Sequence, residues 1–594
     1  MQKKHALLLV FFLEATVALA HPFEYAHPLD GSRFHSCATQ IIIRPGGDVD
    51  DSAMIALMQT KIVASCSGFH SFSVKVAEKN TTVIFTPDEL FVPGEMVLVE
   101  FQGKYRSNLL FEIESEKSIA IPPNDWCTSE EFYGLDLKSS KQRSNFPEAI
   151  VTLEGEPGPG YIYGTTSFNP YDLFILDNTG LPVYSQNIGF LTAQNFRYLN
   201  DSLYVYASIN DRFYIGLDTN FQIVDTFQCV NGLVTDFHEL LMTESGNIIL
   251  MSFDQQMIDM SQLVPGGDPA AIVTGLVIQE INPEDQLVFQ WRSWDHFDIT
   301  DGLYTGNDTI DFTSSIISYV HCNSIEIDHD QNWIISSRHM SEVTKIDRST
   351  GDILWRLGGK NNQFEILNDP LQGFSLQHDA RRTPNGTVTI FDNGVFHVPP
   401  QTRVVEYAID EEQMTATLVW DFTNPYGDVT QVAGNAQRLE NGNTFINWGK
   451  RTTVPIPNDF FLEVDSLGNH IFEMGFAVPP QMGWIYRAYR LPFPGKTIST
   501  SNKKVIQTNP TFELFPNPTS TRIHLQYISD YTGPHQIKVF AITGKEIYSN
   551  SFHASDKEPI LKMISTENYL EGVYFIQLIS EKGMNIIQKC FIKN

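Results

Sequence analysis

Residues 346–355 read IDRSTGDILW, in which an apolar run ends in an aspartate, a short polar turn follows, and a second apolar run ends in tryptophan. Similar hairpins recur at intervals of about 40 to 65 residues through the middle of the chain. The six copies are 176–180 (LDNTG), 217–220 (LDTN), 281–284 (INPE), 346–351 (IDRSTG), 409–412 (IDEE) and 464–468 (VDSLG). A solenoid would need shorter and more uniform repeats, so this pattern predicts a β-propeller with six blades.

Shorter alternating strands flank the predicted propeller, which spans residues 148–492. Residues 21–113 alternate apolar and polar positions between turn clusters and predict an N-terminal β-sandwich. A polar linker, 114–147, follows it, and a second polar linker, 493–511, follows the propeller. Residues 512–594 alternate again and predict a C-terminal Ig-like β-sandwich. We therefore expect an all-β protein with two sandwiches flanking a propeller.

The first 20 residues have the pattern of a secretory signal peptide. Lys3 and Lys4 supply the positive end, 6–13 (ALLLVFFL) the apolar run, and 18–20 (ALA) the small residues of a cleavage site. A membrane-spanning helix requires about 20 apolar residues, and neither this run nor any later segment reaches that length. We expect an exported protein with no transmembrane segment.

Charge and cysteine content exclude several classes of partner. The formal net charge is −30, so nucleic acid and anionic membranes are poor partners, and an anionic substrate needs a local basic pocket. The chain has six cysteines, and none has the spacing of a metal-ligand motif. We predict no metal site. A disulfide between Cys37 and Cys66 is left open, because an exported protein matures in an oxidising compartment.

A polar residue recurs about one strand ahead of four of the hairpins. Each begins a segment in which an apolar strand, a turn with Gly or Asn, and another strand follow in order. The four residues are His238, His321, His378 and Asn435. Because propeller blades are related by rotation about a central channel, residues at one repeat position are expected to form one ring.

Three further polar residues are predicted beside this ring. Asn323 is two positions after His321 and so shares a face of its strand. The turns that follow place Arg338 across from His321 and Asn393 across from His378. The set offers imidazoles, amides and one guanidinium, without a carboxylate dyad, and it suits an oxyanion with several terminal oxygens.

The runs that contain these residues resemble the arylsulfotransferase propeller family. They are 236–239 (DFHE), 321–324 (HCNS), 336–339 (SSRH) and 377–382 (QHDARR), supported by 391–394 (FDNG), 434–437 (GNAQ) and 447–449 (NWG). The resemblance covers roughly residues 148–492. It implies a six-bladed enzyme that moves a sulfuryl group from an aryl sulfate donor to a phenolic acceptor through a sulfohistidine. It also implies independence from nucleotide sulfate and from any cofactor.

By this resemblance, one histidine is the nucleophile and its neighbours assist it. His378 matches the nucleophile and His238 and His321 its partner histidines, while Asn323 matches the amide donor and Arg338 the guanidinium. Asn435 and Asn393 are predicted to contact substrate. A neutral imidazole that attacks sulfur in line would split the transfer into two displacements.

The C-terminal motifs resemble the sorting domain of type IX secretion cargo. They are 514–519 (LFPNPT), 542–545 (ITGK) and 570–575 (LEGVYF). The resemblance implies export through the periplasm by the type IX secretion machinery, to the medium or the cell surface, and no catalytic role for this domain.

Two other functions stay open. A non-catalytic secreted propeller could bind glycans or surface polymers in the same polar ring. Repeats such as 351–355 (GDILW) are also similar to those of quinone-dependent propeller dehydrogenases, although the ring lacks the clustered carboxylates of their calcium site. The sequence leaves the physiological donor and acceptor open.

Overall fold

A computed structural model describes most of the chain. The described residues are 22–115, 146–167, 172–188, 193–200, 202–209, 211–305, 308–450, 458–476, 484–493 and, with short breaks, 512–592. The predicted signal peptide and most of both predicted linkers lie outside these residues. Regular structure is almost entirely strand, which confirms the all-β fold class.

Residues 22–115 fold into two four-stranded antiparallel sheets whose apolar faces pack together. Their strand orders are β1-β2-β6-β5 and β4-β3-β7-β8. The strands are β1 (Tyr25–His27), β2 (Ile41–Arg44), β3 (Lys61–Ala64), β4 (Gly68–His70), β5 (Phe72–Ala77), β6 (Thr82–Pro87), β7 (Met96–Phe101) and β8 (Ser107–Glu112). Alternation along each strand turns side chains such as Ile43, Val83 and Val97 into the shared core.

A short helix and two free cysteines in this region were not predicted. Helix α2 (Asp51–Leu57) begins where the Asp50 carboxylate accepts a hydrogen bond from the Ala53 N–H at 2.7 Å, the usual N-cap interaction. Cys37 and Cys66 are both free thiols, so the disulfide left open by the sequence is not formed.

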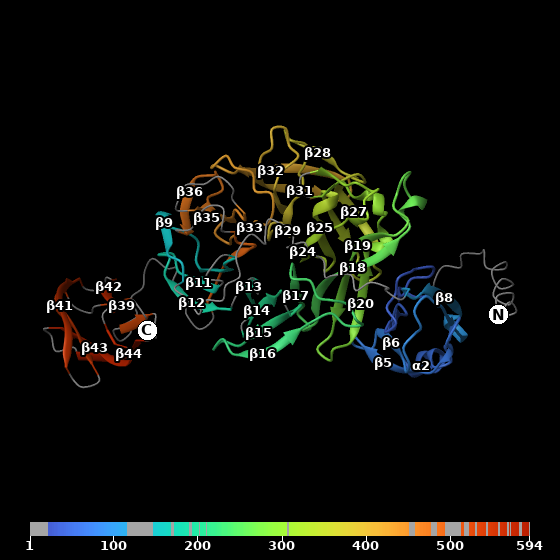
Figure 1. Cartoon of the computed structure of the whole chain (residues 1–594), viewed down its shortest axis with the longest axis horizontal. Helices are drawn as coiled ribbons and strands as arrows, with labels where there is room; N and C mark the ends of the chain where they lie inside the picture. The colour runs from blue at the N-terminus through green and yellow to red at the C-terminus, as the bar shows by residue number, and fades with distance from the viewer. Residues whose placement is uncertain are drawn as a thin grey trace. The chain divides into compact units, whose positions relative to one another are not determined.

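Residues 146–493 form six main sheets, which Figure 1 shows arranged around a centre with β13, β17, β24, β29 and β33 nearest to it. Three of the sheets, in order of pairing, are β12 (Pro182–Asn187), β11 (Asp172–Leu176), β10 (Tyr161–Thr165) and β37 (Ala488–Leu491); β13 (Ala193–Asn200), β14 (Leu203–Ser208), β15 (Phe213–Leu217) and β16 (Ile223–Phe227); and β17 (Leu240–Met242), β18 (Ile248–Ile258), β19 (Ala271–Ile281) and β20 (Leu287–Arg292).

The other three sheets follow in chain order. They are β24 (Cys322–Ile327), β25 (Trp333–Ser337), β26 (Glu342–Ile346) and β27 (Ile353–Gly358); β28 (Glu365–Leu367), β32 (Thr415–Thr423), β31 (Arg403–Asp410), β30 (Val388–Asp392) and β29 (His378–Arg382); and β33 (Asn435–Arg438), β34 (Thr444–Asn447), β35 (Asn458–Val464), β36 (His470–Phe476) and β9 (Ala149–Leu153). The count of six blades stays a prediction. Strands from the two ends of the region pair at β10–β37 and at β36–β9, which joins the ring.

Tryptophans fill the space between neighbouring sheets. Trp291, Trp333, Trp355 and Trp448 are among the largest fully buried side chains. Each belongs to an apolar cluster in the propeller, so these rings stabilise packing and do not face a substrate.

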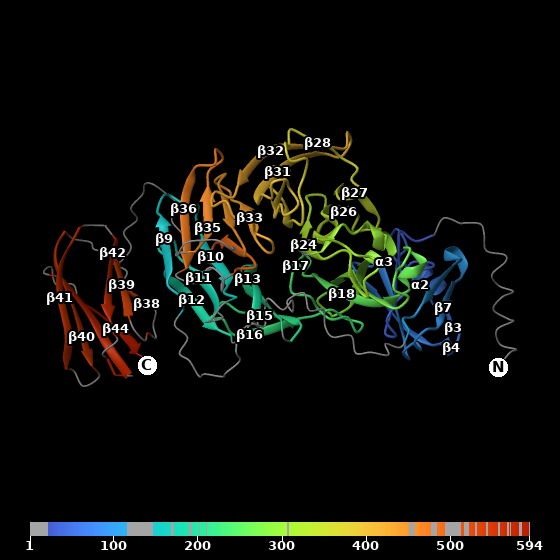
Figure 2. The same cartoon turned by 45° about the horizontal axis from the view of Figure 1, so that its top comes forward.

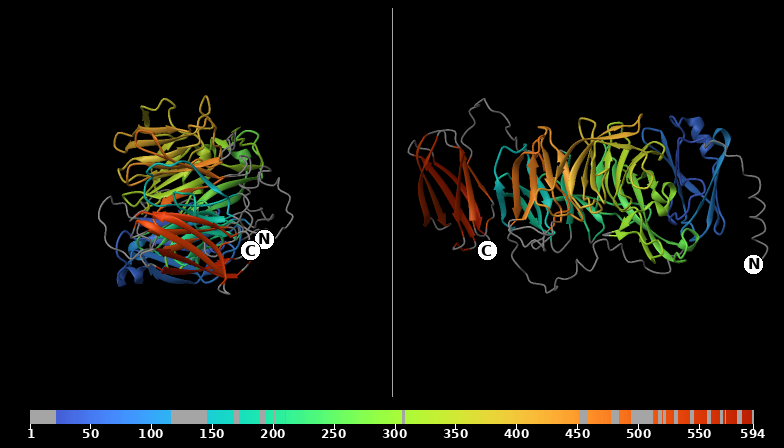
Figure 3. Two further views of the ribbon diagram at one scale, coloured as in Figure 1. Left: turned by 90° about the vertical axis from the view of Figure 1, so that its left-hand side faces the viewer. Right: turned by 90° about the horizontal axis from the view of Figure 1, so that it is seen from above.

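The N-terminal sandwich packs against the sheet that ends in β20, as the blue and green strands in the right-hand view of Figure 3 show. The Tyr25 hydroxyl donates to the Gln290 carbonyl at 2.9 Å and accepts the Gln290 N–H at 2.8 Å. The Tyr25 ring lies 4.6 Å from that of Phe289, and Arg44 donates to the Arg348 carbonyl at 2.9 Å. Because one apolar cluster spans both parts, sandwich and propeller share a hydrophobic core.

The C-terminal residues form two sheets, visible as two layers in Figure 2. The first contains β38 (Phe512–Phe515), β39 (Arg522–Ile528) and β42 (Pro559–Ser565); the second contains β41 (Glu546–Ala554), β40 (Gly533–Ala541), β43 (Gly572–Ser580) and β44 (Asn585–Ile592). Alternating residues such as Leu525, Val539 and Ile576 form the core between them. No helix in the described part of the chain has the length and hydropathy needed to cross a membrane.

Candidate active site

Three histidines from three sheets meet in one buried cluster. His238 and His321 lie just ahead of β17 and β24, and His378 begins β29. The rings of His238 and His321 are 5.2 Å apart and nearly perpendicular. The Tyr486 ring connects the cluster, because its centroid lies 5.4 Å from that of His238 and 6.5 Å from that of His378. The three histidines are between 3% and 8% exposed.

Irregular backbone directs two of these strands into the site. His321 has φ +46°, and the pairing of β24 with β25 shifts register between Cys322 and Ser324. Asp379 has φ +53°, and the pairing of β29 with β30 shifts register just after His378. Left-handed residues and bulges of this kind redirect side chains and are common beside active sites.

The hydrogen bonds of His378 determine which ring nitrogen is available. Asn393 donates its amide to the carbonyls of Thr430 and Ala433, at 2.8 and 3.1 Å, so its carbonyl oxygen faces the imidazole. His378 Nδ1 lies 2.7 Å from that oxygen and must be the donor. Nε2 therefore carries the lone pair, which accepts only a long bond, 3.3 Å, from the Ala433 N–H.

Burial keeps two of the rings neutral. The pKa of His378 is held well below the ordinary value, first by desolvation and then by the charge of Arg338. The pKa of His321 is also held well below the ordinary value, first by desolvation and then by neighbouring His339, whose ring stacks on it at 4.7 Å. Both rings are neutral bases near pH 7.

Arg338 is a buried cation for which the described residues supply no counter-ion. Its Nη2 donates to the Gln431 carbonyl at 3.0 Å, and its backbone N–H donates to the His321 carbonyl at 2.9 Å. Desolvation lowers the pKa of Arg338 to about 10, so the guanidinium is still charged at neutral pH. Among the described residues, Nε has no hydrogen-bond partner. No carboxylate of these residues lies within ion-pair distance of the guanidinium.

The other buried arginines of the propeller pair with a carboxylate. The four pairs are Arg292–Asp295, Arg403–Asp369, Arg487–Glu239 and Arg490–Glu463. An uncompensated buried cation is costly, and an anion with several oxygens would satisfy it. The site therefore has the local positive charge that a net charge of −30 makes necessary for an anionic substrate.

Asp236 completes the site and was not assigned from the sequence. Its Oδ1 accepts hydrogen bonds from His238 Nδ1 at 2.5 Å and from the His238 N–H at 2.8 Å. This orients the ring so that Nε2 faces away from the carboxylate. Asp236 stands two residues before His238, and this spacing could have indicated its role. Tyr486 lies outside the four repeated segments, so no sequence pattern indicated it.

Asn323 and Asn435 each form hydrogen bonds to the backbone of a neighbouring sheet. Asn323 donates its amide to the Gln377 carbonyl at 2.7 Å. Asn435 donates to the Ala488 carbonyl at 2.7 Å and accepts the Ala488 N–H at 2.9 Å. Both are fully buried. The substrate contact predicted for Asn435 stays a prediction.

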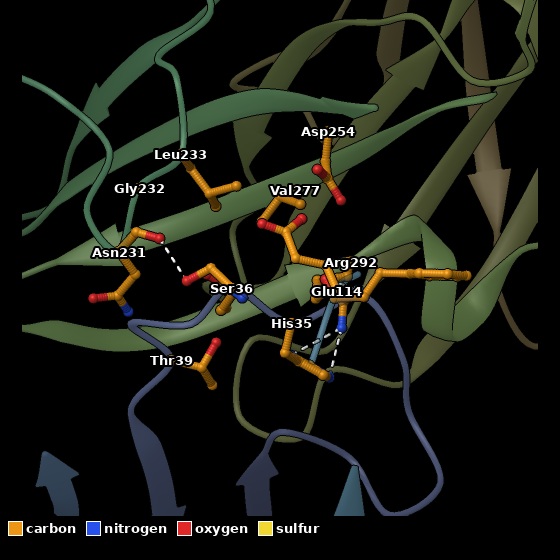
Figure 4. A pocket seen from close by; sticks show the side chains of 12 residues that line it. His35, Ser36, Thr39, Glu114, Asn231, Gly232, Leu233, Asp254, Val277 and Arg292 are labelled. Carbon is orange, nitrogen blue, oxygen red and sulfur yellow. Dashed lines mark hydrogen bonds between the residues drawn. The ribbon is translucent and has the colours of Figure 1, made fainter. Parts of the chain in front are cut away.

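A separate pocket lies where the N-terminal sandwich meets the propeller (Figure 4). Arg292 donates to the His35 ring at 2.7 Å, and Ser36 donates to the Asn231 carbonyl at 2.8 Å. Burial, followed by the charge of Arg292, holds the pKa of His35 well below its ordinary value. None of the predicted site residues lines this pocket.

Two regions of the sequence match known families. Residues 213–473, which include all seven predicted site residues, match the arylsulfotransferase (ASST) family. The chain carries an arylsulfotransferase-family domain. This match supports an arylsulfotransferase-type function for the propeller. Residues 513–593 match the secretion system C-terminal sorting domain, which indicates secretion or a cell-surface location. No curated protein matches the chain.

Three solved structures that are similar to part of this chain are distant from it. A Bacteroides caccae protein of unknown function has a TM-score of 0.35 at 11% identity and covers 56% of this chain and 98% of its own. A streptogramin B lyase has a TM-score of 0.31 at 7% identity, covering 58% and 98%. Virginiamycin B lyase from Staphylococcus aureus has a TM-score of 0.29 at 10% identity, covering 56% and 90%. Likenesses of this size say nothing about the site of the arylsulfotransferase domain.

Proposed function

We propose that this domain transfers a sulfuryl group from an aryl sulfate to a phenol through a covalent adduct on His378. The observation that carries the proposal is a neutral imidazole, whose Nε2 lone pair is set by Asn393, beside a buried arginine that has no counter-ion among the described residues. The first group is a nucleophile and the second is a site for sulfate oxygens.

In the first displacement, His378 Nε2 attacks sulfur. The N–S bond forms while the bond from sulfur to the aryl oxygen breaks, and its electron pair leaves with that oxygen. The imidazole keeps its proton on Nδ1, which donates it in a hydrogen bond to the Asn393 carbonyl oxygen. The positive charge of the sulfated ring and the negative charge of its sulfonate therefore balance. In the second displacement the acceptor oxygen attacks sulfur, and the N–S electron pair returns to His378.

His238 is suited to move the proton. In its protonated form, a proton on Nε2 passes to the leaving aryl oxygen, and the resulting neutral ring then takes the proton of the acceptor phenol. Asp236, bonded to Nδ1, supplies the negative charge that balances the protonated ring. Arg338 donates to the sulfuryl oxygens throughout, from a buried side chain.

The test is an assay of purified protein with a chromogenic aryl sulfate and a phenol acceptor. We expect release of the chromogenic phenolate at a rate that depends on acceptor, together with formation of the sulfated acceptor. Absence of turnover across a broad panel of aryl sulfates would refute the proposal. It would favour the alternative of a non-catalytic propeller that binds glycans or surface polymers.

The tautomer of His378 gives one prediction. Asn393→Leu removes the acceptor for Nδ1–H, so the proton can move to Nε2 and the nucleophilic lone pair is lost. We expect the rate of phenolate release by donor alone, in a single turnover, to fall by about 10²-fold. The thermal midpoint of the variant shows whether the fold is kept. A folded variant with the wild-type rate would mean that Asn393 does not control the ring.

The lowered pKa of His378 gives a second prediction, on the pH dependence of the donor-only rate. A ring with the ordinary pKa of about 6.5 would lose roughly three quarters of its neutral form between pH 8 and pH 6. A lowered pKa leaves His378 neutral throughout this range. With a nitrophenyl sulfate, whose leaving group needs no proton, we expect the donor-only rate to change less than about twofold from pH 8 to pH 6. A fall of about fourfold in this rate would contradict a lowered pKa of His378.

A further inference from the structure

Six buried polar residues, one from each sheet, lie level with one another next to the histidine cluster. Each is within two residues of the start of one strand of its sheet, and these strands are β13, β17, β24, β29, β33 and β37. In chain order they are Asn195, Glu239, Asn323, Asp379, Asn435 and Arg487, and none is more than 2% exposed. Amides and charged groups alternate around the ring. Three of the residues that precede them, His238, His378 and Tyr486, belong to the site.

The charged members of the ring meet as a buried ion cluster. Arg487 Nη1 lies 2.9 Å from Glu239 Oε2, and Arg487 Nε lies 3.3 Å from Asp379 Oδ1. Arg381 pairs with the same two carboxylates, at 2.6 and 2.8 Å, and Arg197 pairs with Glu239 at 2.8 Å. The side chains of Arg487, Glu239 and Asp379 are at most 2% exposed. A water-filled channel would expose them, so the propeller axis is closed at this level.

The same groups hold the backbone of the site. Arg487 Nη1 donates to the His238 carbonyl at 3.1 Å, and its Nη2 donates to the Asn323 carbonyl. Asn195 also donates to the His238 carbonyl, at 3.3 Å. Asn323 in turn donates to the carbonyl of Gln377, the residue before His378. A chain of bonds from Arg487 therefore reaches the backbone on which both His238 and His378 are placed.

We propose that Arg487 is a positioning residue for sulfuryl transfer, which sets the spacing of His238 and His378 and closes the site on the side of the ion cluster. The inference rests on the proposed function. Burying several charges costs desolvation energy, and well-packed apolar residues would often stabilise a fold as well or better. A bidentate guanidinium bonded to two carbonyls of the site instead constrains geometry. With that side closed, leaving phenol and incoming acceptor use one mouth, as two successive displacements allow.

The experiment compares Arg487→Met with a matched control, Arg490→Met. Arg490 lies on β37, is 2% exposed and pairs with Glu463 at 3.0 Å, and it also donates to the carbonyls of Gly158 and Gly160, away from the site. We expect Arg487→Met to lower kcat about 10²-fold while KM for the aryl sulfate changes less than about threefold, because Arg338 is untouched. Arg490→Met should keep kcat within about threefold. Equal losses in the two variants would refute a positioning role.

Two further measurements keep the test independent of folding and of turnover. Arg487→Lys keeps the charge and one hydrogen bond, so it should recover part of the lost kcat without changing KM. Amide hydrogen exchange of the peptides containing His238 and Asn323 should quicken in Arg487→Met and not in Arg490→Met. Unchanged exchange there would refute the inference even if the wild-type protein did not turn over aryl sulfates. If the wild-type protein did not turn over aryl sulfates but the exchange result held, the proposed function would be refuted. The role of Arg487 in holding the backbone of His238 and Asn323 would not be.

Discussion

Replacing His378 with alanine should lower aryl sulfate turnover by at least about 10⁴-fold, because the variant has no group that can accept the sulfuryl group. Arg338 and His238 would still bind and polarise the donor, so KM should change little. The measurement is acceptor-dependent phenolate release in the wild-type protein and in His378→Ala, with thermal midpoints to show that both are folded.

The same experiment identifies the nucleophile directly. Incubation of the wild-type protein with donor alone, followed by peptide mapping, should find a sulfuryl group on the peptide that contains His378. His470→Ala is the control, since His470 lies on β36, away from the cluster, and its loss should leave turnover unchanged. An adduct on His238 or His321 would overturn the assignment of His378.

Replacing Arg338 with methionine should lower kcat/KM for the aryl sulfate by about 10³-fold, the cost of removing a preorganised donor from a buried site. Arg338→Lys restores the charge but not the planar fork, so we expect an intermediate loss of about 10²-fold. Free sulfate should compete with the donor in the wild-type protein and much less in Arg338→Met.

The control for Arg338 is Arg382→Met. Arg382 forms a bidentate pair with Asp328, at 2.7 Å for both bonds, and donates to the Gly386 carbonyl at 2.7 Å. Its replacement should affect stability and leave kcat/KM within about threefold. If Arg338→Met kept wild-type kcat/KM, the unpaired guanidinium would not be the sulfate site.

Much of the site was predictable because a propeller turns sequence period into spatial proximity. His238, His321 and His378 are far apart along the chain, yet each precedes the innermost strand of a sheet, and these strands meet at one centre. Hairpin symmetry likewise predicted that Arg338 lies beside His321 and Asn393 beside His378. The repeats in the sequence were therefore sufficient to predict that these residues lie close together.

Other parts depended on contacts that no local pattern encodes. The hydrogen bonds of Asn323 and Asn435 to neighbouring sheets were not predicted, because they depend on how adjacent sheets pack and not on a repeat within one sheet. Asp236 and Tyr486 enter the site only through the packing of particular loops. Arg487 was not singled out, since its partners lie on three other sheets.

By itself, the sequence determined the all-β class, the repeated sheets, the export domain and the three histidines, since each follows from a period or a local motif. Only the tertiary structure decided which nitrogen of His378 has the lone pair, that Arg338 has no counter-ion among the described residues, and that Arg487 pairs with buried carboxylates. These properties depend on burial and on the neighbours of individual atoms. Neither is defined until the six sheets have packed around a common centre.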